Sequence, residues 1–182
     1  MVTGAGSGIG AAVTSGLAAE GWLVAMAGRR ADALDDVARQ GSDLPGGLDL
    51  VPTDVTVVRP GAVRRPWPVT GGLICSSTTP ACSSPAHDFD EIPLEEWNAV
   101  VAVNLTGAFL CARQAFRVMR SQSPKGGRII NNGSISAHSP RPRSAPYTAT
   151  KHVVTSLTKT IALDGRPHDI ARSQIDIGKR RQ

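Results

Sequence analysis

A tyrosine, a lysine and a serine in the last third of the chain have the types and the spacing of a proton-transfer site. Tyr147 is the only tyrosine, Lys151 follows it four positions later, and Ser134 precedes it by thirteen. Because residues 145–163 read as a helix, positions four apart place the phenol and the ammonium on one face. A nearby cation favours the ionised form of a phenol and lowers its pKa, and a serine hydroxyl alongside could hold the oxygen being protonated. Taken alone, such a pair is also common on a solvated helix face.

A glycine-rich turn at the start of the chain supports the functional interpretation. Residues 1–3 read as the end of an apolar strand, and residues 8–20 read as a helix with apolar positions at helical spacing. Glycines permit a tight turn and let backbone N–H groups approach a diphosphate, whose charge the helix N-terminus favours. The turn, which includes Gly4, Ser7, Gly8, Ile9 and Gly10, could therefore hold a diphosphate, although a glycine cluster alone is weak evidence for such a site.

Together the two motifs resemble one protein family. The pattern Thr-Gly-x-x-x-Gly-x-Gly over residues 3–10, followed by Tyr-x-x-x-Lys over residues 147–151, is similar to the cofactor loop and the catalytic signature of the short-chain dehydrogenase/reductase family. Asp54-Val55 resembles the family's adenine-contacting pair, Asn104 its structural and catalytic asparagine, and Ser134 its serine. Ser136 remains the competing serine. Asn-Asn-Gly at residues 131–133 is superficially similar to the family's Asn-Asn-Ala-Gly motif but lies on a different strand, so we interpret it as backbone and turn chemistry.

The resemblance implies a mechanism and a set of site residues. A nicotinamide cofactor would exchange hydride with the substrate, while Tyr147 would protonate a carbonyl oxygen or deprotonate an alcohol. Lys151 would lower the pKa of the phenol and hold the nicotinamide ribose, and Ser134 would hydrogen-bond the substrate oxygen. Asn104 would anchor a water between Lys151 and solvent; taken alone, it could equally cap the helix that follows. The implied catalytic set is thus Ser134, Tyr147, Lys151 and Asn104.

The residues after the second expected strand bear on the choice of cofactor. Relatives that prefer NAD tend to place an acidic residue there, whereas this chain has Arg29 and Arg30, with Asp32 the next acid. Guanidinium groups suit the additional 2′-phosphate of NADP by charge and by fork geometry. We therefore expect NADP in preference to NAD, which stays possible, and no metal. The implied cofactor-binding residues are Gly4, Ser7, Gly8, Ile9, Gly10, Arg29, Arg30, Asp54, Val55, Tyr147 and Lys151.

Strand and helix patterns alternate along the chain. Strands are expected to end at residue 3 and to cover 22–27, 48–51, 128–131 and 169–177, with helices near 8–20, 31–39, 94–120 and 145–163. This alternation predicts an α/β fold in three layers, with a Rossmann-type doubly wound parallel sheet in a single domain over residues 1–182. Compared with the family, the C-terminal strand and helix are expected to be lacking. The proline-rich loop 137–146 is either one wall of a substrate pocket or an exposed connection.

Composition excludes several other classes of protein. The formal charge is +5, but six basic residues lie in two stretches without any acidic residue, 57–84 and 179–182, and the remainder is nearly neutral. With only 4% aromatic residues, nucleic-acid binding is not expected. No apolar run is long enough for a membrane span and no signal peptide is recognisable, so we expect a cytoplasmic protein without a membrane partner. Three cysteines without paired spacing indicate neither a disulfide framework nor a metal site.

The same two stretches, 57–84 and the tail 179–182, do not fit the family pattern. The codons of residues 70–81 can be read in a frame shifted by one base, with the unknown third base of each codon chosen freely. In that frame they can encode a family-like fourth strand that ends in Asn-Asn-Ala-Gly. We therefore predict that these stretches are translated out of frame relative to the ancestral gene, and that cofactor affinity is poor as a result. Sequencing the underlying DNA tests this, because the hypothesis requires that a shift of one or two bases restores the motif.

Three functions follow from these patterns. The first is an NADP(H)-dependent oxidoreductase that acts on a small-molecule carbonyl or alcohol, whose intact relatives are expected to form homo-oligomers. The second is a truncated, catalytically inactive dinucleotide-binding relic. The third, which is less favoured, is an epimerase or dehydratase that keeps the cofactor bound.

Overall fold

Six parallel strands form one sheet at the centre of the molecule. The computed structural model describes residues 1–57, 74–77 and 85–178. Its strands pair in the order β3-β2-β1-β4-β5-β6, and every adjacent pair is parallel. Their bounds are Val2–Thr3 for β1, Val24–Gly28 for β2, Leu48–Pro52 for β3, Ile74–Ser77 for β4, Gly127–Ser134 for β5 and Ile170–Ile177 for β6. This order confirms the predicted doubly wound α/β fold.

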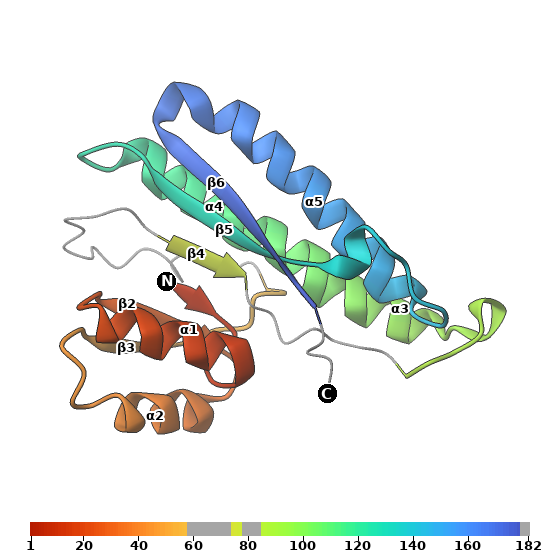
Figure 1. The fold of residues 1–182 in the computed structure, drawn as a ribbon, viewed down its shortest axis with the longest axis horizontal. Helices are drawn as coiled ribbons and strands as arrows, with labels where there is room; N and C mark the ends of the chain where they lie inside the picture. Colours follow the sequence, from red (N-terminus) through yellow and green to blue (C-terminus); the bar gives the residue numbers. More distant parts are fainter. Residues whose placement is uncertain (58–73, 78–84, 179–182) are drawn as a thin grey trace.

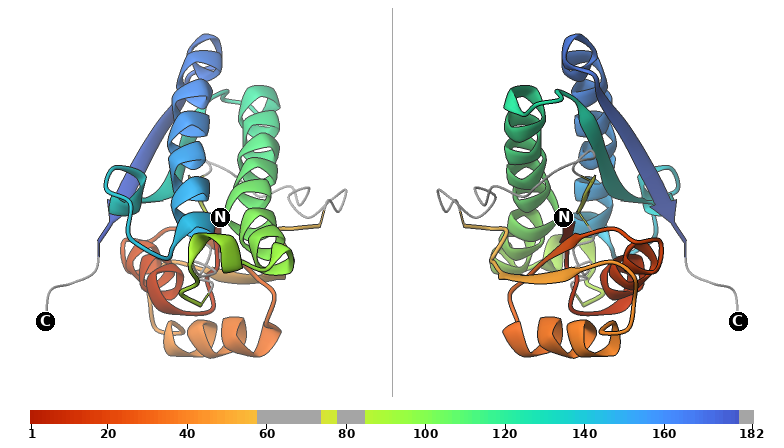
Figure 2. Two further views of the ribbon diagram at one scale, coloured as in Figure 1. Left: turned by 90° about the vertical axis from the view of Figure 1, so that its right-hand side faces the viewer. Right: turned by 90° about the vertical axis from the view of Figure 1, so that its left-hand side faces the viewer.

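Helices connect the strands and cover the sheet (Figure 1). The helix bounds are Gly8–Ala19 for α1, Ala31–Gln40 for α2, Leu94–Val101 for α3, Gly107–Ser121 for α4 and Ala145–Gly165 for α5. The strand order reverses between β1 and β4, and crossovers between parallel strands are right-handed, so α1 and α2 lie on one face and α4 and α5 on the other. Figure 2 shows α4 and α5 side by side and nearly parallel.

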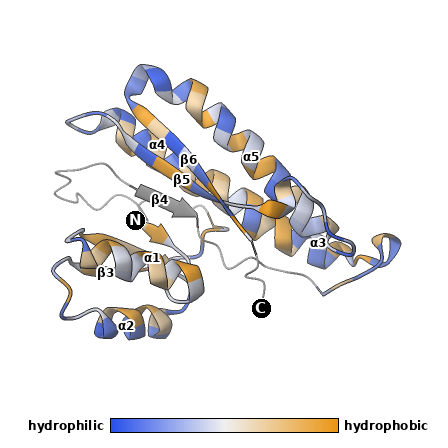
Figure 3. Ribbon diagram, viewed as in Figure 1, coloured by the Kyte–Doolittle hydropathy of each residue, from blue (hydrophilic) through white to orange (hydrophobic). Residues whose placement is uncertain are grey.

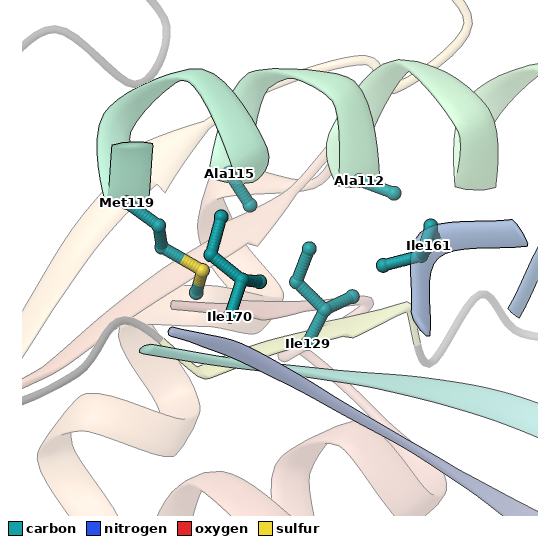
Figure 4. Close-up of a cluster of buried hydrophobic side chains, with 6 residues drawn as sticks. All are labelled: Ala112, Ala115, Met119, Ile129, Ile161 and Ile170. Carbon is teal, nitrogen blue, oxygen red and sulfur yellow. The ribbon is translucent and has the colours of Figure 1, made fainter. Parts of the chain in front are cut away.

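Two apolar clusters hold these layers together. The first joins α4, α5, β5 and β6, with Met119, Ile129 and Ile170 at most 4% exposed (Figure 4). The second packs α1 and α2 against β1 and β2 through residues such as Met26 and Leu34, both fully buried. Figure 3 shows hydrophilic and hydrophobic residues mixed along α2 and α5, as expected for helices with one face on a core.

Element boundaries differ from the sequence prediction by a few residues. Trp22 and Leu23 are 43% and 63% exposed and precede β2, which starts at Val24. β5 continues past residue 131 to Ser134 because its pairing with β6 extends to the end of both strands. Asp169, with φ 55°, forms the left-handed turn before β6 and is not part of the strand.

The segment expected as one helical pattern near 94–120 is continuous from Leu94 to Ser121 but changes type in the middle. Residues Ala102–Thr106 form a π-helical turn, in which the N–H of Gly107 donates to the carbonyl of Ala102. By length and hydropathy alone this helix is long and apolar enough to cross a membrane. Its buried residues pack against the sheet in the first cluster, which is what the core helix of a globular domain also does.

The stretches predicted to be out of frame fall mostly on residues 58–73, 78–84 and 179–182, which lie outside the described residues. One segment of the stretch 57–84 is described. It is the strand β4, Ile74–Ser77, which pairs with both β1 and β5 at the centre of the sheet.

Candidate active site

The glycine-rich turn joins β1 to α1 at the carboxyl edge of the sheet. Gly4 has φ 67° and Gly8 has φ 53°, left-handed conformations that glycine adopts without the steric cost of a side chain. α1 begins at Gly8, and Ser7, its N-cap, makes no side-chain capping bond. The first N–H groups of the helix therefore point to the space in front of the turn, where a negative charge is favoured.

A cavity of about 380 Å³ opens at this edge. It lies at the carboxyl ends of β1, β2 and β3, beside the point where the strand order reverses, which is where ligands bind in open α/β sheets. Its wall consists of the glycine turn, the residues that end β2, the loop after β3 and part of the π-helical turn. These segments contribute residues 3, 4, 6 and 7, then 28–30 with Ala33 and Leu34, then 53–56 and Val103.

Six of the predicted cofactor-binding residues line this cavity, namely Gly4, Ser7, Arg29, Arg30, Asp54 and Val55. Gly8, Ile9 and Gly10 instead form the first turn of α1, where Gly10 is buried and Ile9 is 46% exposed. None of the three is part of the cavity wall, so any contact from them to a dinucleotide would come from the backbone of the helix start.

Asp54 and Val55 are held in place by local and tertiary contacts. One carboxylate oxygen of Asp54 accepts hydrogen bonds from the backbone N–H and the hydroxyl of Thr56, at 2.9 and 2.7 Å. Val55 packs against Gly107 at the start of α4 so closely that a Cβ at Gly107 would lie 2.9 Å from a Val55 methyl. The loop after β3 is thus fixed against the helix that carries the asparagine of the predicted catalytic set.

The charge at the cavity mouth comes mainly from Arg29 and Arg30. Both are exposed, and within the described part of the chain neither forms an ion pair. By contrast, Arg39 on the same side of the molecule is paired with Asp35 and Asp36. Asp32, the next acid along the chain, lies in the first turn of α2 and is not part of the cavity wall. Two unpaired guanidinium groups make this end of the cavity suitable for a phosphate.

Tyr147 and Lys151 lie together on α5, as their spacing predicted. The Lys151 Nζ lies 5.6 Å from the centroid of the Tyr147 ring and donates a hydrogen bond of 2.8 Å to the carbonyl of Asn132 on β5. Lys151 is only 3% exposed, and this burial lowers its pKa from 10.5 to about 8, although the carboxylate of Asp176 acts in the opposite direction. The lysine is thus a buried cation held beside the phenol.

Ser134 ends β5, two positions after the carbonyl that binds Lys151. It is buried, and its hydroxyl accepts a hydrogen bond of 3.1 Å from the N–H of Ser136, which starts a short 3-10 turn over Ile135–Ala137. A hydroxyl that accepts one bond can still donate another. The competing residue, Ser136, is also buried, and its hydroxyl has no partner among the described residues. Ser134 therefore stays the prediction and Ser136 its alternative.

Asn104 lies inside the π-helical turn between α3 and α4. The alternative that it caps the following helix is wrong, because the backbone is helical on both sides of it. The side chain is 2% exposed; its Nδ2 is 3.5 Å from the Thr150 hydroxyl, and its Oδ1 has no partner within the described ranges. Thr150 in turn donates to the Tyr147 carbonyl at 2.8 Å. Since Val103 lines the cavity, this turn connects the cavity to the helix of the tyrosine.

The proline-rich loop after Ser134 also lies beside the tyrosine. The guanidinium carbon of Arg141 is 5.8 Å from the centroid of the Tyr147 ring. Arg143, with φ 56°, donates to Asp88 at 2.7 Å and so ties this loop to the segment before α3. Arg141 of this loop therefore lies next to the candidate proton donor, and Arg143 anchors the loop to Asp88, a residue distant in sequence.

Several residues of the site were not predicted from the sequence. Thr53, Thr56 and Val103 line the cavity, and their position directly after a strand or beside Asn104 is a signal that could have identified them. Asp176 and its partner His138 have no local motif. Their only signal is that each follows or ends a strand at the carboxyl edge of the sheet.

Comparison with known proteins gives a consistent result. The family model for short chain dehydrogenases matches residues 1–179. An uncharacterized oxidoreductase of Staphylococcus aureus (strain MRSA252) is 36% identical over 163 residues, which cover 87% of this chain and 68% of that relative. An uncharacterized oxidoreductase of Thermotoga maritima is 35% identical over 167 residues, covering 90% of this chain and 63% of the relative.

Solved structures give the same fold. A 3-ketoacyl-(acyl-carrier-protein) reductase from Brucella melitensis, complexed with NADH, superimposes with a TM-score of 0.86 at 26% identity, over 96% of this chain and 72% of that one. An acetoin dehydrogenase from Salmonella typhimurium superimposes with a TM-score of 0.84 at 28% identity, over 97% of this chain and 74% of that one.

Proposed function

Because the chain belongs to the short chain dehydrogenase family, whose members are oxidoreductases that use a nicotinamide dinucleotide, we propose that it interconverts a carbonyl and an alcohol with NADP(H). One observation carries this proposal. The buried Lys151 lies beside Tyr147 at the carboxyl edge of the sheet, the same edge at which the cavity opens. A proton donor and a cavity beside a glycine-rich turn at one edge are what such a reaction needs.

The residues of the cavity fit the cofactor. The backbone between Gly4 and Ser7 and the start of α1 would hold the diphosphate, and Arg29 with Arg30 would bind the 2′-phosphate. Asp54 and Val55 would contact the adenosine end. When bound, the nicotinamide ring would supply or accept the hydride.

The side chains of the protein would carry out the proton transfer. In reduction, Tyr147 would donate its phenolic proton to the substrate oxygen, and in oxidation it would take that proton back. The Lys151 ammonium would balance the negative charge left on the phenol oxygen, and its bond to the Asn132 carbonyl fixes it in position. The Ser134 hydroxyl would donate a hydrogen bond to the substrate oxygen. Asn104 would hold a water that connects Lys151 to solvent.

The names of the similar structures suggest the first substrates to try. One of these proteins is named an acetoin dehydrogenase and another a 3-ketoacyl-(acyl-carrier-protein) reductase. A small hydroxyketone and a 3-ketoacyl thioester are therefore suitable first probes, to be followed by a wider panel of carbonyls and alcohols. Oxidation of NADPH, followed by absorbance, measures turnover directly.

Replacing the proton donor tests the catalytic assignment. Tyr147→Phe should reduce turnover by about a hundredfold or more, because only the acid–base group is removed. NADPH should still bind, as measured by fluorescence. His152→Gln, an exposed neighbour on α5, is the control and should keep full activity. Turnover that survives in Tyr147→Phe would refute the assignment.

Two other outcomes would favour the alternative functions. NADPH binding without turnover on any substrate would indicate the inactive dinucleotide-binding protein. Conversion of substrate without net consumption of NADPH would indicate an epimerase or dehydratase.

Reversing one charge tests the cofactor preference. Arg29→Asp should weaken NADPH binding by about tenfold or more and NADH binding much less, because a charge-assisted contact to the 2′-phosphate becomes a repulsion. Arg39→Asp makes the same charge change on α2, outside the cavity wall, and should affect neither cofactor. Equal losses for both cofactors in Arg29→Asp would contradict the proposed role.

A further inference from the structure

A carboxylate at the end of β6 lies next to the candidate active site and belongs to none of the motifs. Asp176 Oδ2 is 2.8 Å from Nε2 of His138, which lies just after the 3-10 turn that follows Ser134. Its other oxygen accepts a hydrogen bond of 2.7 Å from Gln174 Nε2. Gln174 also donates to Thr155 on α5 at 2.9 Å, so the carboxylate is held by β6 and the loop after β5 directly and by α5 through Gln174.

A glycine makes room for this carboxylate on β5. Gly133 is the residue directly opposite Asp176 in the β5–β6 register. A Cβ at Gly133 would overlap Oδ1 of Asp176 and would lie 2.7 Å from Gln174 Nε2. Any side chain at position 133 would therefore push Asp176 off the strand that ends in Ser134.

The carboxylate acts on two residues of the predicted catalytic set. The backbone N–H of Ser134 is among the groups that lower the pKa of Asp176. Burial acts to raise the pKa of Asp176, but its hydrogen bonds outweigh burial and the pKa lies below its ordinary value, so the group is a carboxylate near neutral pH. Its charge opposes the effect of burial on the pKa of Lys151.

We propose that Asp176 is a positioning residue of the candidate active site, which holds the turn after Ser134 through His138 and places a negative charge near Lys151. All of its contacts described above are made by residues of the chain itself. The inference therefore rests on the proposed function only for its effect on catalysis, and it can be tested without turnover.

Asp176→Asn removes the charge of the side chain and keeps its shape. Two NMR experiments on the purified chain measure the effects of this substitution. The titration midpoint of Lys151, assigned by loss of its signal in Lys151→Met, should fall below about 8, because burial is then unopposed. Amide hydrogen exchange at Ser134 should become about tenfold faster or more, because the end of β5 loses the charged group that anchors the following turn through His138. Asp176→Glu, which keeps the charge, should leave the Lys151 midpoint closer to that of the parent protein.

Asp164→Asn is the matched control, since it removes one carboxylate from the exposed end of α5, about 20 Å from Lys151 along the helix. It should change neither measurement. Gly133→Ala provides an independent perturbation that displaces Asp176 without removing it, and it should reproduce both effects of Asp176→Asn.

The proposal is overturned if Asp176→Asn and Asp164→Asn give the same Lys151 midpoint and the same Ser134 exchange rate. A lower melting temperature with both readouts unchanged would also overturn it, because that result describes a structural residue only. Failure of NADPH to bind or be oxidised would count against the proposed function and leave these two readouts intact.

Discussion

The burial of Lys151 makes the stability of this protein depend on pH in a way that can be measured. The folded chain lowers the pKa of this amine from 10.5 to about 8, and its side chain is nearly inaccessible to solvent. A shift of this size corresponds to about 3 kcal/mol of cost for keeping the ammonium in the folded state. Since Lys151 is 3% exposed, solvent does little to screen this cost.

Whether stability rises or falls with pH follows from the pKa of Lys151 in the folded and in the unfolded state. The folded pKa lies below the unfolded one, so below about pH 8 folding bears the full cost of burying a charge. As the pH rises from about 8 to about 10.5, the folded state has lost the proton while the unfolded state still binds it, and stability increases. Between pH 7 and about pH 9.5 this single group should add about 2 kcal/mol to the free energy of unfolding.

Lys151→Met isolates this contribution. Urea unfolding, followed by tryptophan fluorescence at several pH values, should show the parent protein gaining about 2 kcal/mol relative to Lys151→Met across that interval. Lys159→Met removes an exposed amine from the same helix, and its curve should run parallel to that of the parent. If the curves of the parent and Lys151→Met are parallel as well, the lysine is not a strained buried cation, and the electrostatic argument for its role beside Tyr147 fails.

Three further substitutions, the first with a matched control, test the elements that position the site. Gly8→Ala should destabilise the fold by about 1 kcal/mol because φ is 53° there, whereas Gly16→Ala, in the exposed middle of α1, should stabilise it by a similar amount. Changes of the same sign for both variants in urea unfolding would contradict the assigned turn. Gly107→Ala should displace Val55 and weaken NADPH binding, measured by fluorescence titration, and unchanged affinity would show that the loop after β3 does not depend on this contact. Asn131→Ala should cost about 1–3 kcal/mol in thermal unfolding, because it removes a buried hydrogen bond of 2.8 Å to α5, and a neutral result would mean that the bond is replaced.

Much of this protein could be predicted from local sequence. The glycine turn, the helix that carries Tyr147 and Lys151, and the alternation of strands and helices are encoded in residues a few positions apart, because φ, ψ and side-chain periodicity are local properties. The doubly wound parallel sheet follows from that alternation and from the handedness of crossovers. The same logic placed Arg29 and Arg30 at the end of a strand, where the structure has them at the cavity mouth.

Tertiary structure decided the remaining features, since they depend on pairs that are distant in the chain. The π-helical turn around Asn104 carries no periodic signal, and only the helical backbone on both sides of the residue shows that it does not cap a helix. The spacing of Tyr147 and Lys151 placed both on one face, but the burial that sets the lysine pKa comes from its packing against β5. The contact between His138 and Asp176 spans 38 positions and exists because β5 and β6 pair in one register, which sets Asp176 opposite Gly133. A shift of that register by one residue would turn Asp176 to the other face of the sheet.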